Sequence, residues 1–224
     1  MDADFPSHEG WVSFEVPEAG KPVSTFYKII GDVTEATPLI ALHGGPGAGH
    51  EYLYPLTDLY KDHKIPIVFY DQIGCASSTH LPEKLGDETF WTFDLFIKEL
   101  ENLIDKLDIR SRGFYVYGSS WGAVLAGAYA SRQPLGLKKL IISSGPCDMD
   151  LYTKGVQSLL KQLPDKYQQV LAECERKEKY EGPEYEEACL EFAKRFTCRL
   201  DPFPKGLQDA FVHLSEDRTT ELTM

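Results

Sequence analysis

The stretch FYVYGSSWG, residues 114–122, decides the fold. Its first four residues are apolar or aromatic, as in a buried strand, and residues 121–132 continue as a run of small residues typical of a packed helix. Glycines stand two positions before and two positions after Ser120, which permits a sharp turn between the two elements. We therefore predict a strand, a cramped turn and a helix, with Ser120 exposed at the turn.

A serine exposed in this way can act as a nucleophile. Its hydroxyl is weak, so it must be held near a base and near donors that stabilise the oxyanion formed on attack. Ser120 has the symmetric glycine spacing of a nucleophile elbow. Ser119 is the rival, but it lacks that spacing and is explained as a small filler at the turn. Ser120 is therefore the predicted catalytic nucleophile.

The glycine-rich loop HGGPG, residues 43–47, follows an earlier apolar run and fits the same site. Glycines let backbone N–H groups approach a reacting carbonyl. Gly45 is the favoured donor of an oxyanion hole and Gly44 the second, with the N–H of Trp121 as the other half. His43 precedes the predicted nucleophile in the sequence. In this fold the catalytic histidine follows the nucleophile, so we expect His43 to have a structural role.

The first two thirds of the chain alternate between strand and helix patterns. Short, continuously apolar runs are typical of strands covered on both faces, and an apolar stripe at spacings of three and four is typical of a helix. The order predicts an α/β fold with a doubly wound, mostly parallel sheet. The predicted elements are a hairpin over 11–16 and 24–30, strands over 38–42, 65–70, 114–117 and 137–143, and helices over 93–107 and 121–132.

The composition changes after Gly145 and Pro146. From Met149 onward the pattern is helical and rich in Lys, Glu, Gln and Leu, without a strand signal. We predict two domains, a core over residues 1–147 and a helical region over 148–224. The acidity of the second region is interpreted as a solvated helix face rather than a functional surface.

Charge limits the partners of the protein. With 23 basic and 35 acidic residues, the formal charge is −12, which opposes binding to nucleic acid or to an anionic membrane. Small molecules or peptides are the expected partners. The N-terminus has neither a basic start nor an apolar run, and no segment approaches the roughly 18 apolar residues of a membrane span. We expect a cytosolic protein.

The five cysteines are an odd number with no Cys-x-x-Cys pair. Neither a disulfide framework nor a zinc site is indicated, and free, mostly buried thiols are expected. They are Cys75, Cys147, Cys174, Cys189 and Cys198.

Three motifs together, HGGPG at 43–47, DQIGC at 71–75 and GSSWG at 118–122, resemble the proline iminopeptidase family of α/β-hydrolases. Their order and spacing fit throughout residues 24–147. The resemblance implies an α/β-hydrolase core with an inserted helical cap, matching the region from Met149. It also implies a serine aminopeptidase that releases an N-terminal residue, often proline, from peptides or amides without a metal or cofactor.

The chain departs from the family pattern beside two of these motifs. Ala76 and Ser77 stand where the family usually has glycine and arginine, Ser119 where it commonly has glycine, and Ala123 where it often has glycine. The nucleophile is retained, so these departures bear on which residue is released rather than on the reaction.

A catalytic acid and base are not identifiable after Ser120, although the fold places both there. His213 is the only later histidine, and it lies in a helix-like stretch where a cap-surface or packing role is favoured over that of a base. The later aspartates do not follow buried strands; they are Asp148, Asp150, Asp165, Asp201, Asp209 and Asp217.

Residues 219–224 resemble the family segment just before an Asn-Gly-Pro-Ser-Glu-Phe motif, which supplies a glutamate for the substrate's amino group. The chain ends before that motif. We therefore hypothesise that it is the N-terminal part of a longer enzyme, with the C-terminal part of the core missing. The outer edge of the strand over 137–143 would then be exposed, which is an aggregation liability.

Two classes of function remain open from the sequence. The first is a serine hydrolase acting on a peptide N-terminus or an amino-acid amide, with an ester or lactone as the alternative substrate. The second is a non-catalytic fragment or pseudoenzyme that keeps the core for binding or assembly. The sequence does not specify an oligomeric state.

Overall fold

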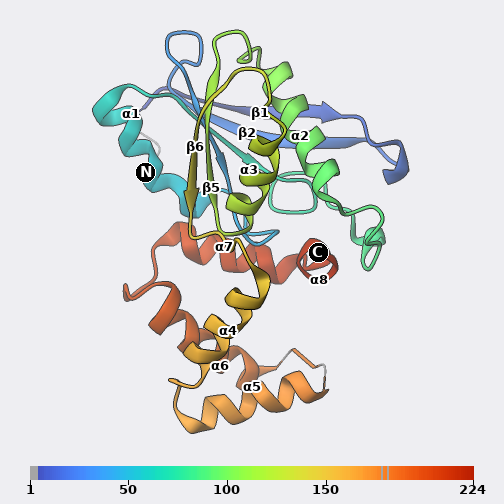
Figure 1. Ribbon diagram of the computed structural model, residues 1–224, viewed down its shortest axis with the longest axis vertical. Coiled ribbons are helices and arrows are strands. Elements are labelled where there is room, and N and C mark those ends of the chain that lie inside the picture. Colours follow the sequence, from blue (N-terminus) through green and yellow to red (C-terminus); the bar gives the residue numbers. More distant parts are fainter. Residues whose placement is uncertain (1–4, 178, 181) are drawn as a thin grey trace. The chain divides into compact units, whose positions relative to one another are not determined.

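The computed structural model describes residues 5–177, 179–180 and 182–224, and it contains a six-stranded mixed sheet (Figure 1) with the strand order β1-β2-β4-β3-β5-β6. The strands are β1 Ser7–Phe14, β2 Val23–Ile30, β3 Leu39–Leu42, β4 Ile67–Asp71, β5 Phe114–Ser119 and β6 Leu137–Ser143. β1 and β2 form the predicted hairpin, and β2 pairs antiparallel with β4. The four strands from β4 to β6 are parallel neighbours, so the predicted α/β fold class is confirmed.

Helices cover both faces of this sheet. Alternate residues of β3 point to opposite sides: Ile40 belongs to the core cluster beneath α2 and α3, and Leu39 to the cluster beneath α1. This arrangement is the doubly wound pattern that the sequence predicted. The helices are α1 Thr57–His63, α2 Phe93–Lys106 and α3 Trp121–Ser131, and a 3₁₀-helix η2, Glu51–Leu56, precedes α1.

Helix α2 begins where the sequence predicted it. The Thr92 hydroxyl accepts a hydrogen bond from the N–H of Leu95 at 3.2 Å and so caps the first turn. Helix α1 was not predicted. None of its seven residues is fully buried, so it lacks the apolar stripe that reveals a helix in a sequence.

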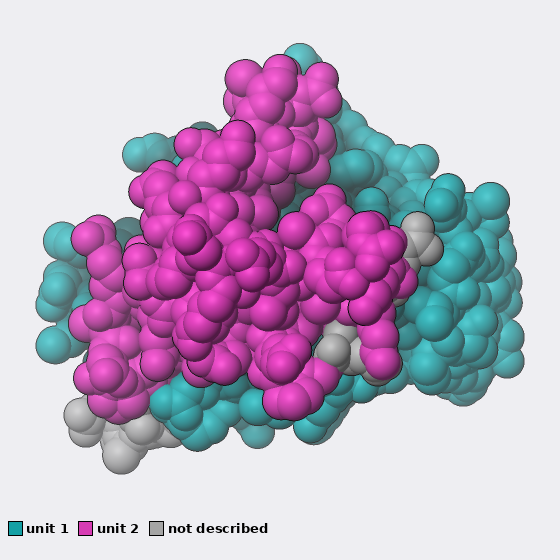
Figure 2. All heavy atoms as spheres, turned by 90° about the horizontal axis from the view of Figure 1, so that it is seen from below, with its two compact units in different colours: residues 1–145, 205–224 teal, residues 146–204 magenta. Residues whose placement is uncertain are grey.

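The chain forms two compact units (Figure 2). Unit 1 comprises residues 1–145 and 205–224, and unit 2 comprises residues 146–204. In the described part of unit 2 every regular element is helical, as predicted. Its elements are α4 Met149–Leu160, α5 Asp165–Lys177, α6 Pro183–Phe192 and a π-helical turn, Ala193–Thr197.

The last two helices, α7 Lys205–Glu216 and α8 Thr219–Thr223, belong to unit 1. Contacts between residues 205–224 and the core include His213 Nε2 at 3.1 Å from a Glu51 oxygen, Asp217 at 2.6 Å from His80 Nδ1, and a hydrogen bond from the Gly86 N–H to the Thr223 hydroxyl at 2.9 Å. This grouping differs from the predicted division, which placed all of residues 148–224 in one helical region. Amphipathic spacing reveals a helix but not the body it packs against, so the sequence did not separate residues 205–224 from the region before them.

Strand β6 is an edge strand, as predicted for residues 137–143. Its apolar side chains are unusually open: Leu140 is 38% exposed, Ile141 42% and Ile142 50%. Large apolar side chains on a sheet edge favour pairing with another strand.

The five cysteines are all free thiols, but they are not mostly buried, as the sequence suggested. Cys75 alone is buried, Cys147 is exposed, and the other three lie between these extremes. The four cysteines other than Cys75 lie in unit 2, where Leu163 and Ala188 are the buried apolar residues among those described. None of the helices within residues 5–177, 179–180 and 182–224 combines the length and the apolar character of a transmembrane span.

Candidate active site

Ser120 stands at the junction of β5 and α3, in the predicted strand–turn–helix. Its backbone has φ 53° and ψ −119°, a conformation that a residue with a side chain rarely adopts. Hydrogen bonds fix both sides of the turn: the N–H of Ser120 donates to the Ser143 carbonyl at 2.9 Å, and its carbonyl accepts from the N–H of Ala123 at 2.9 Å. The strain is therefore held by the neighbouring strand and the first helical turn.

The two flanking glycines are required by close packing of backbone on backbone. A side chain at position 118 would fall on the carbonyl oxygen of Gly122, and one at position 122 would fall on the carbonyl oxygen of Leu42, at the end of β3. Any larger residue would push the turn away from the sheet. The GSSWG spacing, which predicted the turn, is thus a packing requirement of the elbow.

The loop after β3 lies directly against the nucleophile. A Cβ atom at Gly44 would stand 3.0 Å from the Ser120 Cβ. The N–H of Gly44 donates to the Tyr52 hydroxyl at 2.7 Å, so this donor is already used inside the protein. Among the described residues, none accepts a hydrogen bond from the N–H of Gly45. Of the two predicted donors, Gly45 is therefore the one whose N–H is not already bound within the described protein.

Trp121 provides the second candidate donor. It is the first residue of α3, and the N–H groups of a first helical turn have no acceptor within their own helix. The positive end of the helix dipole points the same way, which favours negative charge beside Ser120. Ser120, Gly44, Gly45 and Trp121, four residues singled out from the sequence, thus meet at one edge of the sheet.

His43 is enclosed in the core and engaged at both ring nitrogens. Nδ1 lies 2.9 Å from the Gly44 carbonyl, and Nε2 accepts from the N–H of Gln72 at 3.0 Å. Burial lowers the pKa of His43, although the nearby charge of Asp71 opposes this effect. The ring is therefore neutral at pH 7 and holds the loop in place.

The DQIGC motif acts as an anchor, a role that the sequence did not predict. The Asp71 carboxylate is buried; it accepts from the N–H of His50 at 3.0 Å and of Ser77 at 3.1 Å, and it lies 2.8 Å from His50 Nδ1. Burial opposes the ionisation of Asp71, but these hydrogen bonds and the His50 charge hold its pKa below the usual value. Since its partners are 6 and 21 residues away, no local pattern announces this role.

One group of side chains has ligand types suited to a metal ion. Atoms of His50, Glu51 and Asp71 all lie within 4.8 Å of one another. The His50 ring is already hydrogen-bonded to Asp71 at Nδ1 and lies 3.1 Å from the Tyr54 hydroxyl at Nε2. The group is thus a hydrogen-bonded anchor for the loop, and a cation would have to displace these bonds.

His213 lies on Glu51 and not on the nucleophile. Its Nε2 is 3.1 Å from a Glu51 oxygen, and this hydrogen bond raises the pKa of His213. Burial of Glu51 would raise the pKa of that carboxyl group, but the hydrogen bond with His213 outweighs this effect and the pKa of Glu51 is lowered. Among the described residues, no histidine hydrogen-bonds the Ser120 hydroxyl. His213 therefore contacts η2 within unit 1.

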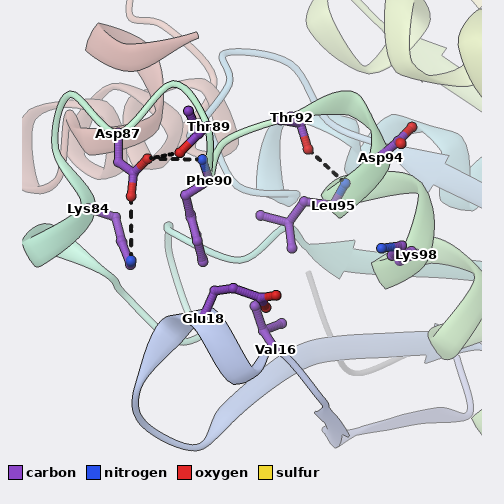
Figure 3. A pocket seen from close by; sticks show the side chains of 10 residues that line it. All are labelled: Val16, Glu18, Lys84, Asp87, Thr89, Phe90, Thr92, Asp94, Leu95 and Lys98. Atoms are coloured by element: carbon purple, nitrogen blue, oxygen red, sulfur yellow. Dashed lines mark hydrogen bonds and ion pairs between the residues drawn. The ribbon is translucent and has the colours of Figure 1, made fainter.

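A cavity of about 360 Å³ lies elsewhere in unit 1, beside the start of α2 (Figure 3). Asp87 lies against Lys84, Thr89 and the N–H of Phe90 on one wall, and Glu18 faces them. None of the residues that line this cavity comes from the elbow or from the loop after β3. It is separate from the candidate active site.

Comparison with known proteins gives three findings. The α/β-hydrolase fold family matches residues 37–180. A proline iminopeptidase of Lactobacillus delbrueckii subsp. lactis is 34% identical over 179 residues, which are 80% of this chain and 60% of that protein. The chain thus spans about three fifths of the length of this relative.

Two solved structures are similar over nearly the whole chain. VinJ is 36% identical with a TM-score of 0.89, and the match covers 98% of this chain and 71% of VinJ. The proline iminopeptidase of Mycobacterium smegmatis is 31% identical with a TM-score of 0.77, covering 95% of this chain and 69% of that one.

Proposed function

Because the chain belongs to the proline iminopeptidase family of α/β-hydrolases, we propose that it carries the nucleophile of a serine hydrolase. The proposed reaction releases an N-terminal residue, proline or another amino acid, from a peptide or amide. One observation carries the proposal: Ser120 is held at a positive φ against Gly44, at the N-terminus of α3.

In the proposed reaction, the Ser120 oxygen bonds to the substrate's carbonyl carbon while the proton of its hydroxyl passes to a general base. The carbonyl electrons move onto oxygen, where the N–H groups of Gly45 and Trp121 stabilise the charge. Collapse of this intermediate breaks the C–N bond, and the base returns its proton to the departing amine. Water then hydrolyses the acyl-enzyme and restores Ser120.

We propose that the base and its acid partner lie in a continuation of the protein after residue 224. Two observations support this idea. His213, the only histidine that follows Ser120, is engaged with Glu51. The relative from Lactobacillus delbrueckii is also longer, since the match covers 60% of it. Intact mass and the coding sequence test the proposal, and a natural stop after Met224 with a stable monomer would contradict it.

Labelling with a fluorophosphonate tests the nucleophile. The full-length product should be modified at Ser120, found by mass spectrometry of its peptides, because such probes react with activated serines. Ser120→Ala should abolish the label, and Ser119→Ala, the matched control at the rival serine, should keep it. A full-length product that is folded but unmodified at Ser120 would refute the hydrolase proposal.

A panel of proline and other aminoacyl amides, set against simple esters and lactones, then decides the substrate class. We expect the amides with a free amino group to be the better substrates. Faster turnover of esters would support the esterase or lactonase alternative. The non-catalytic alternative is favoured by the lack of a histidine on Ser120 among the described residues, and it predicts neither label nor turnover.

A further inference from the structure

Gln72 is a buried amide placed between the two halves of the candidate active site. It lies just after β4, in the DQIGC motif, and only 1% of its surface is exposed. Transferring an amide from water to a protein interior is costly unless its donor and acceptor are both satisfied. The partners of its hydrogen bonds therefore identify the groups that this buried amide holds in position.

Both ends of the side chain are used, and each binds a different part of the site. Oε1 accepts from the indole N–H of Trp121 at 3.0 Å, and Nε2 donates to the His43 carbonyl at 3.1 Å. The backbone N–H of Gln72 also donates to His43 Nε2, at 3.0 Å. One residue thus connects the elbow to the loop after β3.

These two partners carry the candidate oxyanion donors. Trp121 directly follows Ser120, and His43 directly precedes Gly44 and Gly45. If the elbow and the loop moved apart, Gln72 would lose one of its two side-chain bonds and leave a polar group unpaired in the core, which costs about 1–3 kcal/mol. The amide therefore resists a change in the spacing between the N–H groups of Trp121 and Gly45.

The Trp121 ring is fixed on its other side by aromatic packing. Phe93 stacks on it with ring centres 4.9 Å apart and an angle of 27° between the planes. Phe96 meets it edge-on at 5.9 Å. Packing alone leaves a flat ring free to slide, whereas the bond from its N–H to Gln72 sets its position along the stack.

We propose that Gln72 is a positioning residue that sets the spacing of the two oxyanion donors through Trp121 and His43. The inference rests on the proposed hydrolase function, because it assigns Gln72 a part in the same reaction. Among the described residues, the hydrogen bonds of the Gln72 side chain go to Trp121 and His43 and none goes to Ser120. It should act on the rate of the chemical step and not on substrate binding, since the oxyanion forms only on the way to the transition state.

The first experiment measures the geometry without catalysis. Trp11, Trp91 and Trp121 each give one indole signal in a proton–nitrogen NMR spectrum. Gln72→Met keeps the length of the side chain but removes both bonds, and it should move the Trp121 signal upfield to a position typical of an unbonded indole. The Trp11 indole donates to the Ser77 carbonyl and should stay in place, as an internal control.

The second experiment measures kcat and KM of the full-length product with an aminoacyl amide. Gln72→Met should lower kcat by about 10- to 100-fold, the loss expected from donors misplaced by a fraction of an ångström. KM should change less than about twofold. Trp121→Phe keeps the backbone donor and the stack on Phe93 but loses the indole N–H, so it should lower kcat in the same way. Trp11→Phe, which removes an indole bond at the surface, is the matched control.

The double variant Gln72→Met/Trp121→Phe separates a shared role from two unrelated losses. If the bond between the two residues is what matters, the double variant should be no slower than the slower single variant. Losses that multiply, or a Gln72→Met enzyme that keeps its kcat while the wild type is active, would overturn the inference alone. An inactive wild-type enzyme would refute the proposed function and, with it, the positioning role of Gln72 in the reaction.

Discussion

Glu99 is a residue of α2 whose carboxyl group is enclosed in the core, and its charge state should control stability near neutral pH. The side chain has no exposed surface. One oxygen accepts from the Thr25 hydroxyl at 2.6 Å and from the Ile73 N–H at 2.9 Å, while the other has no partner among the described residues. Burial raises the pKa of Glu99 from 4.5 to about 8, although the two hydrogen bonds oppose the shift.

The sign of the effect follows from where the proton is held. Above pH 4.5 the unfolded chain releases the Glu99 proton, whereas the folded protein keeps it until about pH 8. The free energy of unfolding therefore falls by about 1.4 kcal/mol per pH unit across this interval. The loss is about 3 kcal/mol at pH 7 and about 5 kcal/mol above pH 8.

Glu99→Gln should remove this loss. Glutamine cannot ionise, and its carbonyl oxygen can still accept from Thr25 and Ile73. The variant should match the wild type near pH 5 and exceed its stability by about 3 kcal/mol at pH 7. Urea unfolding from pH 5 to 9, followed by tryptophan fluorescence, measures the difference, because all three tryptophans lie in unit 1.

Glu101→Gln is the matched control on the same helix. Glu101 contacts Arg110 and the Tyr129 hydroxyl and is partly exposed, so its replacement should change stability by the same amount at pH 6 and pH 8.5. A difference between Glu99→Gln and wild type that stays constant from pH 5 to 9 would refute the argument. Glu99 would then be charged in the folded protein.

Three further changes test the construction of the site. Ser120→Gly should be about 1 kcal/mol more stable than Ser120→Ala, because glycine relieves the positive φ and both changes remove the nucleophile; equal stabilities in urea would show that the turn is not strained. Gly122→Ala should cost more than about 2 kcal/mol, because its methyl group would fall on the Leu42 carbonyl, and an unchanged melting temperature would contradict this. His213→Ala should speed amide hydrogen exchange in α7. Wild-type protection there, corrected for intrinsic exchange, should decline as pH rises through the His213 pKa, which Glu51 raises above 6.5; protection that is independent of pH would argue against the pair.

The parts of the fold that the sequence predicted are those with a strong local pattern. The strand over 137–143 has the predicted bounds, and α2 ends one residue before the predicted helix end. Both owe this to continuous or periodic apolar residues. Helix α1 was not predicted because it buries no residue completely. The sequence grouped α7 with the helices of unit 2, because His213 in α7 contacts Glu51, which is 162 residues away along the chain, and no local pattern connects the two.

The candidate site likewise contains residues that a local pattern predicted and residues that it did not. Ser120 could be singled out because the two glycines that allow its turn stand beside it in the sequence. Gln72 could not, since its side chain reaches partners 29 and 49 residues away, and only the folded sheet brings them together. Tyr52 was missed for a related reason. Its hydroxyl accepts the hydrogen bond from the Gly44 N–H, one of the two candidate donors of the loop, and this contact depends on the position of η2 in the fold.

These supporting contacts affect rate and stability unequally. A single buried hydrogen bond contributes about 1 kcal/mol to the free energy of unfolding, which a domain with a core of this size can lose. The same loss can shift an N–H donor by a few tenths of an ångström, and groups that stabilise an oxyanion must be placed to within about 0.5 Å. Residues that touch no substrate, such as Gln72, should therefore be detected through kcat before they are detected through melting temperature. The strained φ of Ser120 is the complementary case, since it lowers stability while exposing the hydroxyl that reacts.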